Sequence, residues 1–209
     1  RSPERGIQMF TAIYPIIHAQ YPDTTFQPIE ANVESQLKMM DAREMDISFQ
    51  TIFERKYKHL VYETIFYEPF YLCVPKTHPL AYREPLEPSQ YPEISLKQFR
   101  DELFTLVKKS STMRVVIDQL FKKAGFEPKL LFESTSMRTM LRLTENSQCC
   151  SIIPRYYAVP SEHVSYFSLG PDASWELAAV HAQNHYINNA AKDFIRMAVV
   201  YWKAHPYSD

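Results

Sequence analysis

Glycine is scarce in this chain, with only 3 in 209 residues, whereas it makes up roughly 7% of an average globular protein. The sequence contains neither the GxGxxG pattern of dinucleotide-binding folds nor the GxxxxGK[ST] phosphate loop. Both patterns need glycines so that the backbone can approach a phosphate closely. The common classes of nucleotide-dependent enzyme are therefore not expected.

Long apolar runs are also missing, since no stretch approaches the roughly 18 residues that a membrane-spanning helix needs. The first five residues are polar and lack the apolar stretch of a signal peptide. Neither charge sign dominates, because 23 basic and 24 acidic residues give a net charge of −1. A domain that binds DNA by itself usually has a basic surplus. We therefore expect a soluble chain that needs no membrane and does not bind DNA alone.

Cysteine pairs suited to a disulfide or a metal site are missing. Cys73, Cys149 and Cys150 are odd in number and form no CxxC motif, and adjacent cysteines rarely bridge each other because the loop is too short. A reducing compartment such as the cytoplasm fits this pattern. A redox role for Cys149 and Cys150 would need a nearby cation or helix start to lower the thiol pKa. Their neighbours are uncharged, so buried structural cysteines are the favoured interpretation.

Strand-like and helix-like patterns alternate along the whole chain. The clearest helix carries apolar residues at helical spacing from Met113 to Ala124, with Gly125 placed to end it. Such alternation predicts an α/β fold of mainly parallel sheet flanked by helices on both faces. Further helices are expected at 33–40, about 136–144 and 194–202, and strands at 24–30, 45–49, 60–66, 70–75, 103–107, 129–133, 150–153, 164–168 and 176–182.

Five short passages occur in an order typical of one family. They are YPD at 21–23, DAREMDI at 41–47, EPFYLCVPKTHPLA at 68–81, FKKAGF at 121–126 and SIIP at 151–154. With them the chain resembles the effector-binding domain of LysR-type transcriptional regulators, which shares its fold with type 2 periplasmic solute-binding proteins. It departs from the family at 146–150, where glycines are usual and Asn-Ser-Gln-Cys-Cys stands instead.

The resemblance implies two lobes joined by two crossover strands. Lobe I would hold residues 1–67 and 169–209, and lobe II residues 68–168. The chain begins where the family's first strand should end, so that strand and an N-terminal DNA-binding domain would be missing from it. Such domains form dimers or tetramers, contact DNA only through the missing domain, and close their lobes around a small-molecule effector.

Candidate binding residues lie where strands end and helices begin, because helix N-termini carry partial positive charge and free N–H groups. The resemblance places effector-contacting loops at the same positions, and Ser2, Thr51 and Thr112 match hydroxyl positions of the family. Hydroxyl and cationic side chains favour an anionic metabolite. The predicted ligand-binding residues are Ser2, Arg5, Gln50, Thr51, Lys108, Ser110, Ser111 and Thr112.

Ordinary structural roles compete with each of these assignments. Ser110, Ser111 and Thr112 could simply cap the following helix, a role worth about 1 kcal/mol. Lys108 could belong to a solvated loop, and Arg5 to the surface. Ser134 to Ser136 could also reach a ligand, but capping of the next helix is the favoured role there.

Catalytic and metal-binding patterns are not found. The seven histidines are scattered, without HExxH spacing or an accompanying carboxylate triad. No local arrangement supports a Ser/His/Asp or Cys/His centre. We therefore predict no catalytic residue, no metal, no cofactor and no enzymatic activity.

Two functions from different classes remain open on these grounds. The first is a cytoplasmic effector sensor of a LysR-type regulator, in which lobe closure on the effector is relayed to DNA binding. The alternative is an extracytoplasmic solute-binding protein of a transporter, which would carry a signal peptide or lipid anchor. The VPKTHPLA passage and the unpaired cysteines favour the first. An enzyme on the same fold is a third possibility without specific support.

Overall fold

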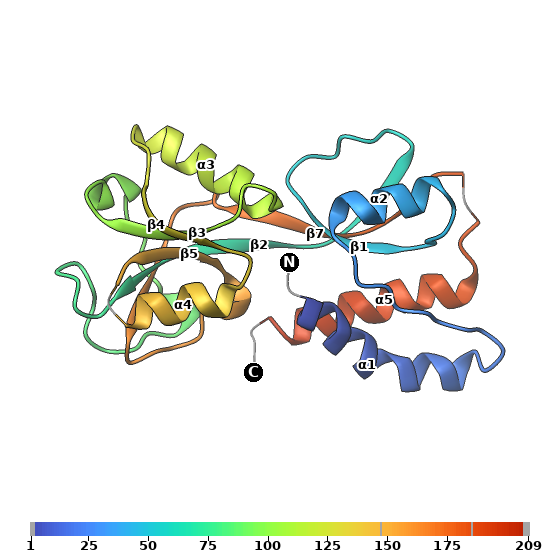
Figure 1. Cartoon of the computed structure of the whole chain (residues 1–209). Helices are drawn as coiled ribbons and strands as arrows, with labels where there is room; N and C mark the ends of the chain where they lie inside the picture. Colours follow the sequence, from blue (N-terminus) through green and yellow to red (C-terminus); the bar gives the residue numbers. More distant parts are fainter. Residues whose placement is uncertain (1–2, 147, 185, 207–209) are drawn as a thin grey trace. The chain divides into compact units, whose positions relative to one another are not determined.

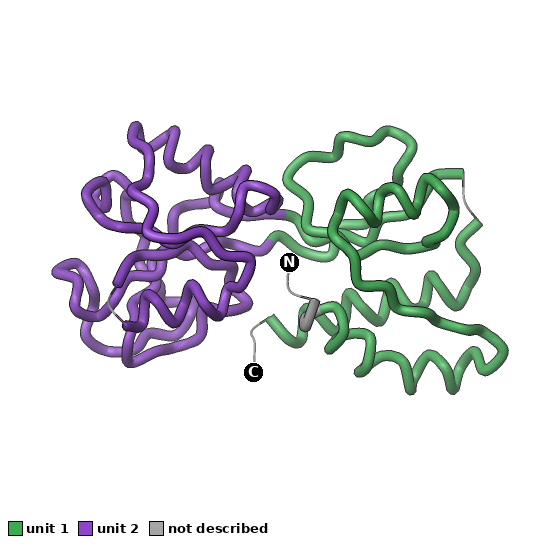
Figure 2. The backbone as a smooth tube through the Cα atoms, viewed as in Figure 1, with its two compact units in different colours: residues 1–67, 176–206 green, residues 68–175, 207–209 purple. Residues whose placement is uncertain are grey.

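The computed structural model describes residues 3–146, 148–184 and 186–206, with side chains described from residue 6 onward. The chain divides into two compact units (Figure 2). Unit 1 comprises the residues up to Tyr67 together with Glu176–Pro206, and unit 2 comprises Glu68–Trp175. Two strands, β2 (Leu60–Pro75) and β7 (Ser174–Ala182), carry the chain from one unit to the other.

Unit 1 places helices on both faces of its sheet, in which β7 lies between β1 and β2 (Figure 1). Strand β1 runs antiparallel to β7. Successive residues of β7 point to opposite faces, and both faces are buried: Val180 packs in a cluster with Met40 of α2, whereas Leu177 packs in a cluster with residues of α1 and α5. The elements of this unit are α1 (Pro3–Gln20), α2 (Val33–Asp41), β1 (Ser48–Ile52) and α5 (Asn189–Ala204).

Unit 2 is built on a mixed sheet, with α3 and α4 on opposite sides of it (Figure 1). Strands β3, β4 and β5 are parallel to one another, whereas β5 and β6 both pair antiparallel with β2. The elements are β3 (Leu103–Val107), α3 (Thr112–Ala124), β4 (Lys129–Ser134), α4 (Met137–Glu145), β5 (Cys150–Pro154) and β6 (Val164–Ser168), with short 3-10 turns at Pro88–Gln90, Leu96–Phe99 and Arg155–Tyr157.

Helix α3 follows the sequence pattern closely. All of its predicted apolar stripe is buried, from Met113 to Ala124. Gly125 ends the helix with φ 77°, a left-handed conformation in which a side chain would be strained. The α/β class and this helix are therefore confirmed.

Three strand expectations were wrong. Residues 24–30 form no strand; Phe26 instead packs on Phe194 of α5, with ring centroids 5.4 Å apart. Their alternating pattern satisfied local strand preference, but a strand also needs a hydrogen-bonded neighbour. The strand expected at 45–49 lies at Ser48–Ile52. The strands expected separately at 60–66 and 70–75 form one continuous strand through Glu68-Pro69, because the residue before a proline is pushed toward extended backbone, which a strand accepts. The sheet is also mixed rather than mainly parallel.

The boundary between the units lies at residue 176, whereas the sequence placed it at 169. The intervening residues pack with unit 2, where Ala173 and Trp175 belong to the main core cluster. The Trp175 indole Nε1 donates a 2.8 Å hydrogen bond to the carboxyl group of Glu68, which is fully buried. The backbone N–H of Tyr156 donates to the other oxygen of Glu68 at 3.1 Å.

We expect Trp175→Phe to lower the free energy of unfolding by about 1–3 kcal/mol, because the buried Glu68 carboxyl group loses a hydrogen-bond donor. Urea denaturation measures the change. Trp202→Phe is the matched control, since the buried Nε1 of Trp202 finds no hydrogen-bond partner among the described residues. An equal loss in both variants would show that ring size, rather than the hydrogen bond, is responsible.

Candidate functional site

A polar loop, residues 108–111, joins the carboxyl end of β3 to the start of α3. Val107 and Ser134, the last residues of β3 and β4, are paired in the parallel register. The backbone N–H of Lys108 donates to the Ser134 carbonyl oxygen at 3.2 Å. Carboxyl ends of parallel strands are where α/β proteins bind ligands. The structure thus brings Lys108, Ser110, Ser111 and Thr112 together at such an edge.

The start of α3 differs from the other helix starts for which the structure describes the N-cap residue. In α2, α4 and α5 an Asn or Ser side chain accepts a hydrogen bond from an N–H of the first turn. Ser111 holds the same position in α3, but its side chain makes no capping bond. Simple capping by Ser111 is therefore not observed. The Arg114 N–H of the first turn donates to the Ser111 carbonyl oxygen at 3.0 Å, whereas no hydroxyl of the N-cap residue competes with an anion for the other first-turn N–H groups.

Ser134 and Ser136, at the start of α4, have the structural role that the sequence favoured. The Ser136 hydroxyl accepts from the backbone N–H of Thr139 at 3.2 Å and so caps the helix. The Ser134 hydroxyl accepts from the Ser136 N–H at 3.0 Å.

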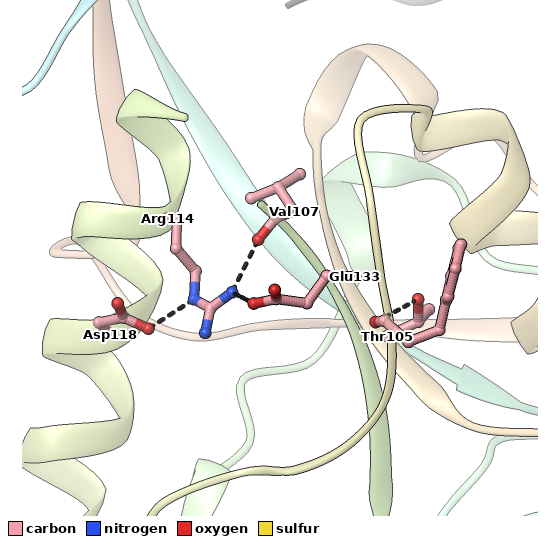
Figure 3. Close-up of polar contacts among 6 residues, drawn as sticks. Thr105, Val107, Arg114, Asp118 and Glu133 are labelled. Carbon is pink, nitrogen blue, oxygen red and sulfur yellow. Dashed lines mark hydrogen bonds and ion pairs between the residues drawn. The ribbon is translucent and has the colours of Figure 1, made fainter. Parts of the chain in front are cut away.

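A buried arginine that the sequence analysis missed lies behind the loop (Figure 3). Arg114 is 4% exposed, and its guanidinium donates to the Val107 carbonyl oxygen at 2.8 Å, to Asp118 at 2.6 Å and to Glu133. Burial acts to lower the pKa of Arg114, but the bonds to Asp118 and Glu133 outweigh it and hold the pKa above its ordinary value. The spacing of Arg114 and Asp118, four residues apart on a helix, was the available signal.

The candidates in unit 1 have a different setting. Gln50 is buried, and its amide donates to the Ser48 hydroxyl at 2.9 Å, which donates in turn to Gln36 at 2.6 Å. These hydrogen bonds already use one N–H of the Gln50 amide group inside unit 1. Thr51 is half-buried on β1.

Two further predictions, Ser2 and Arg5, cannot be placed. Ser2 lies outside the described residues, and although Arg5 belongs to α1, its side chain lies outside them.

The cysteines are buried and unpaired. Burial raises the pKa of Cys150 to about 12 and that of Cys73 well above its ordinary value; the pKa of Cys149 is raised for the same reason. All three thiols are therefore protonated near neutral pH, as expected of structural cysteines.

Neither a metal cluster nor a membrane-spanning helix is found in the described part of the chain. There, no three His, Cys, Asp or Glu side chains gather in a way that could hold a metal ion. None of the helices described has the length and apolar character needed to cross a bilayer.

A cavity of about 450 Å³ lies in unit 2 at the amino-terminal ends of β3 and β5. It is thus at the opposite end of β3 from the polar loop. His78 lines it and lies 3.4 Å from Glu102, measured from Nε2 to Oε1. The sequence did not single out this cavity, and none of the candidate residues whose side chains the structure describes lines it.

The chain is an α/β protein of two units with a polar loop at the carboxyl edge of a sheet, where proteins of this class commonly bind ligands. Comparison with known proteins identifies its family. Residues 8–201 match the family model described as the LysR substrate binding domain. The chain belongs to this family, and the resemblance inferred from its sequence is confirmed.

Similar proteins are regulators or parts of them. An uncharacterised HTH-type transcriptional regulator of Bacillus subtilis (strain 168), YybE, is 22% identical over 176 residues, covering 84% of this chain. This chain spans only 57% of that relative's length.

Solved structures share the fold. The effector-binding domain of QuiR in complex with shikimate gives a TM-score of 0.70 at 20% identity, covering 93% of this chain and 90% of that one. The BenM effector-binding domain with its effector benzoate gives a TM-score of 0.72 at 16% identity, covering 96% of this chain and 89% of that one.

We expect iodoacetamide to alkylate none of the three cysteines in the folded chain at neutral pH, under conditions that alkylate all three after denaturation. Burial keeps the thiols protonated and leaves the three residues at most 5% exposed, even though Cys149 and Cys150 line the cavity of unit 2. Mass spectrometry of peptides measures the labelling. Rapid native labelling of Cys149 or Cys150 would revive the redox interpretation.

The raised pKa of Cys150 also gives a pH dependence. The folded state holds this proton more tightly than the unfolded chain does, so the contribution of Cys150 to stability is full below roughly pH 8.5. It declines as the pH rises toward the folded pKa of about 12. We expect Cys150→Ala to flatten the alkaline fall in the free energy of unfolding, measured by urea denaturation across this range. An unchanged alkaline slope would contradict the raised pKa.

Proposed function

We propose that this chain is the effector-sensing part of a LysR-type transcription regulator, binding a small anionic metabolite and relaying that event to DNA binding. Membership of the LysR substrate-binding family is the observation that carries the proposal. The relative that is longer than this chain is described as an HTH-type regulator, which supports an N-terminal DNA-binding domain in the whole protein. The whole protein would act in the cytoplasm as a dimer or tetramer, and it would bind its effector without turnover.

The chemistry at the start of α3 supports an anionic effector. The Ser111 hydroxyl caps none of the first-turn N–H groups, and the partial positive charge of a helix N-terminus favours anions. Lys108 and Lys109 are exposed beside it. Shikimate and benzoate, named with the QuiR and BenM structures, are carboxylates at neutral pH. We therefore place Lys108, Ser110, Ser111 and Thr112 in the binding site. Ser2, Arg5, Gln50 and Thr51 remain predictions.

The effect on DNA binding has a thermodynamic limit. A ligand shifts an equilibrium between two states of the domain only by the difference between its affinities for them, typically about 1–3 kcal/mol. The alternative of a transport receptor shares the fold but has no specific observation in its favour.

The proposal is tested with the whole regulator, including the proposed DNA-binding domain. We expect it to bind promoter DNA in an anisotropy assay, with an affinity that changes by about 5- to 150-fold when the right member of a carboxylate panel is added. A panel that includes shikimate, benzoate and short dicarboxylates is the natural start. A whole protein that ignores promoter DNA under every condition would overturn the proposal.

Two serines that stand at equivalent helix positions should give opposite results when changed to alanine. Ser111→Ala should weaken binding of the effector by about 1–3 kcal/mol, because buried polar groups of the complex lose a partner. It should leave stability nearly unchanged, since Ser111 caps nothing. Ser136→Ala should instead lower the free energy of unfolding by about 0.5–2 kcal/mol and leave effector affinity unchanged.

Calorimetric titration and urea denaturation of both variants measure these effects, with Thr112→Ala and Thr51→Ala as further tests of the binding residues. If Ser111→Ala changes only stability, the hydroxyl is an ordinary cap and the site lies elsewhere.

A further inference from the structure

Arg114 connects three elements of unit 2 through a single buried guanidinium group (Figure 3). Its Nη1 donates to the Val107 carbonyl oxygen at the end of β3 and to the Glu133 carboxylate near the end of β4. Its Nε donates to Asp118, one turn further along α3. The guanidinium is planar and presents its donors in a fixed fork, so these bonds fix directions as well as distances.

The bonds of Arg114 span the polar loop from one end to the other. Val107 immediately precedes Lys108, and Arg114 lies two residues after Thr112 in the first turn of α3. The bond from Arg114 to the Val107 carbonyl therefore closes the segment that holds the proposed binding residues. The bond to Glu133 ties the same side chain to the neighbouring strand, whose last residue, Ser134, accepts from the N–H of Lys108.

The charge of Arg114 is already matched inside the protein. Two carboxylates, Asp118 and Glu133, lie on its guanidinium. The arginine side chain is 5% exposed, whereas those of Asp118 and Glu133 are 51% and 35% exposed. An arginine held in this way does not offer its charge to an external anion, so a role as a direct effector ligand does not fit the geometry.

We propose that Arg114 is a positioning residue for the effector site, which fixes the 108–112 loop and the first turn of α3 without touching the ligand. The inference deepens the proposed function and rests on it. A binding group must be held within about 0.5 Å of its productive position by such supporting contacts. Without Arg114 the loop would keep its sequence but lose its anchor to β3 and β4.

The test compares three variants of the 209-residue chain by NMR, with inorganic phosphate as the anionic probe. Arg114→Lys keeps a positive charge but cannot reach three partners with a planar fork. Arg114→Met removes the charge at similar length. Asp118→Asn is the matched control, because it weakens the contact to the exposed helix position and keeps those to Val107 and Glu133.

In the unaltered chain, phosphate should shift the amide signals of residues 110–113. Arg114→Lys should accelerate amide hydrogen exchange at Lys108 and Ser111, whose N–H groups donate to the Ser134 and Lys108 carbonyl oxygens. It should also weaken phosphate binding. We expect each change to be about tenfold, the lower end of the effect seen when outer-shell partners of metal ligands are removed. Exchange in the rest of unit 2 should not change. Asp118→Asn should stay within about twofold of the unaltered chain on both measures.

Each outcome decides one part of the argument. Unaltered exchange and phosphate affinity in Arg114→Lys would overturn the positioning role and leave the proposed function intact. Acceleration spread evenly over unit 2 would overturn it too, because it would show a general stabilising role. If phosphate shifts no loop amide even in the unaltered chain, the proposed anion site fails, while the exchange data still decide whether Arg114 orders the loop. If Arg114→Met does not fold, Arg114→Lys decides.

Discussion

The long strand β2 constrains much of the structure, because one run from Leu60 to Pro75 contributes to the cores of both units. Leu60 and Ile65 are buried in clusters of unit 1, and Phe70 and Leu72 in the main cluster of unit 2. An uninterrupted strand can serve two cores only if each part finds its own neighbours. β5 and β6 supply them in unit 2 through antiparallel pairs, which is why the sheet is mixed.

Buried polar groups add specificity to this apolar framework. Glu68 is bound by Trp175, 107 positions away in sequence. In unit 1, Glu176 accepts from Arg55, 121 positions away, at 2.5 Å. An unpaired buried polar group costs about 1–3 kcal/mol, more if it is charged. Such pairs therefore favour one arrangement of distant segments over others of similar apolar burial.

The candidate site depends on the same principle at shorter range. Its hydroxyls and lysines lie on a loop, whose conformation local sequence specifies poorly. The surrounding elements fix the conformation of the loop: the ends of β3 and β4 are paired, and the Arg114 guanidinium connects the two ends of the segment. The start of α3, which has no side-chain cap, lies at the end of this loop. The proposed effector binding needs such order, because the affinity difference between two states of a domain is typically small compared with the cost of ordering a free loop.

The sequence by itself determined the features that depend on neighbours a few residues apart. The sequence predicted helix α3 with its end at Gly125, the α/β class, the polar segment 108–112 and the family motifs. It could do so because helical periodicity and helix termination depend on residues close together in the sequence. Only the tertiary structure decided that 24–30 forms no strand, that Glu68-Pro69 continues one, that Gln50 is engaged inside unit 1, and that Arg114 lies buried behind the loop. These outcomes depend on partners far away along the chain. A strand exists only beside another strand, and a buried polar side chain is stable only where folding brings it a partner.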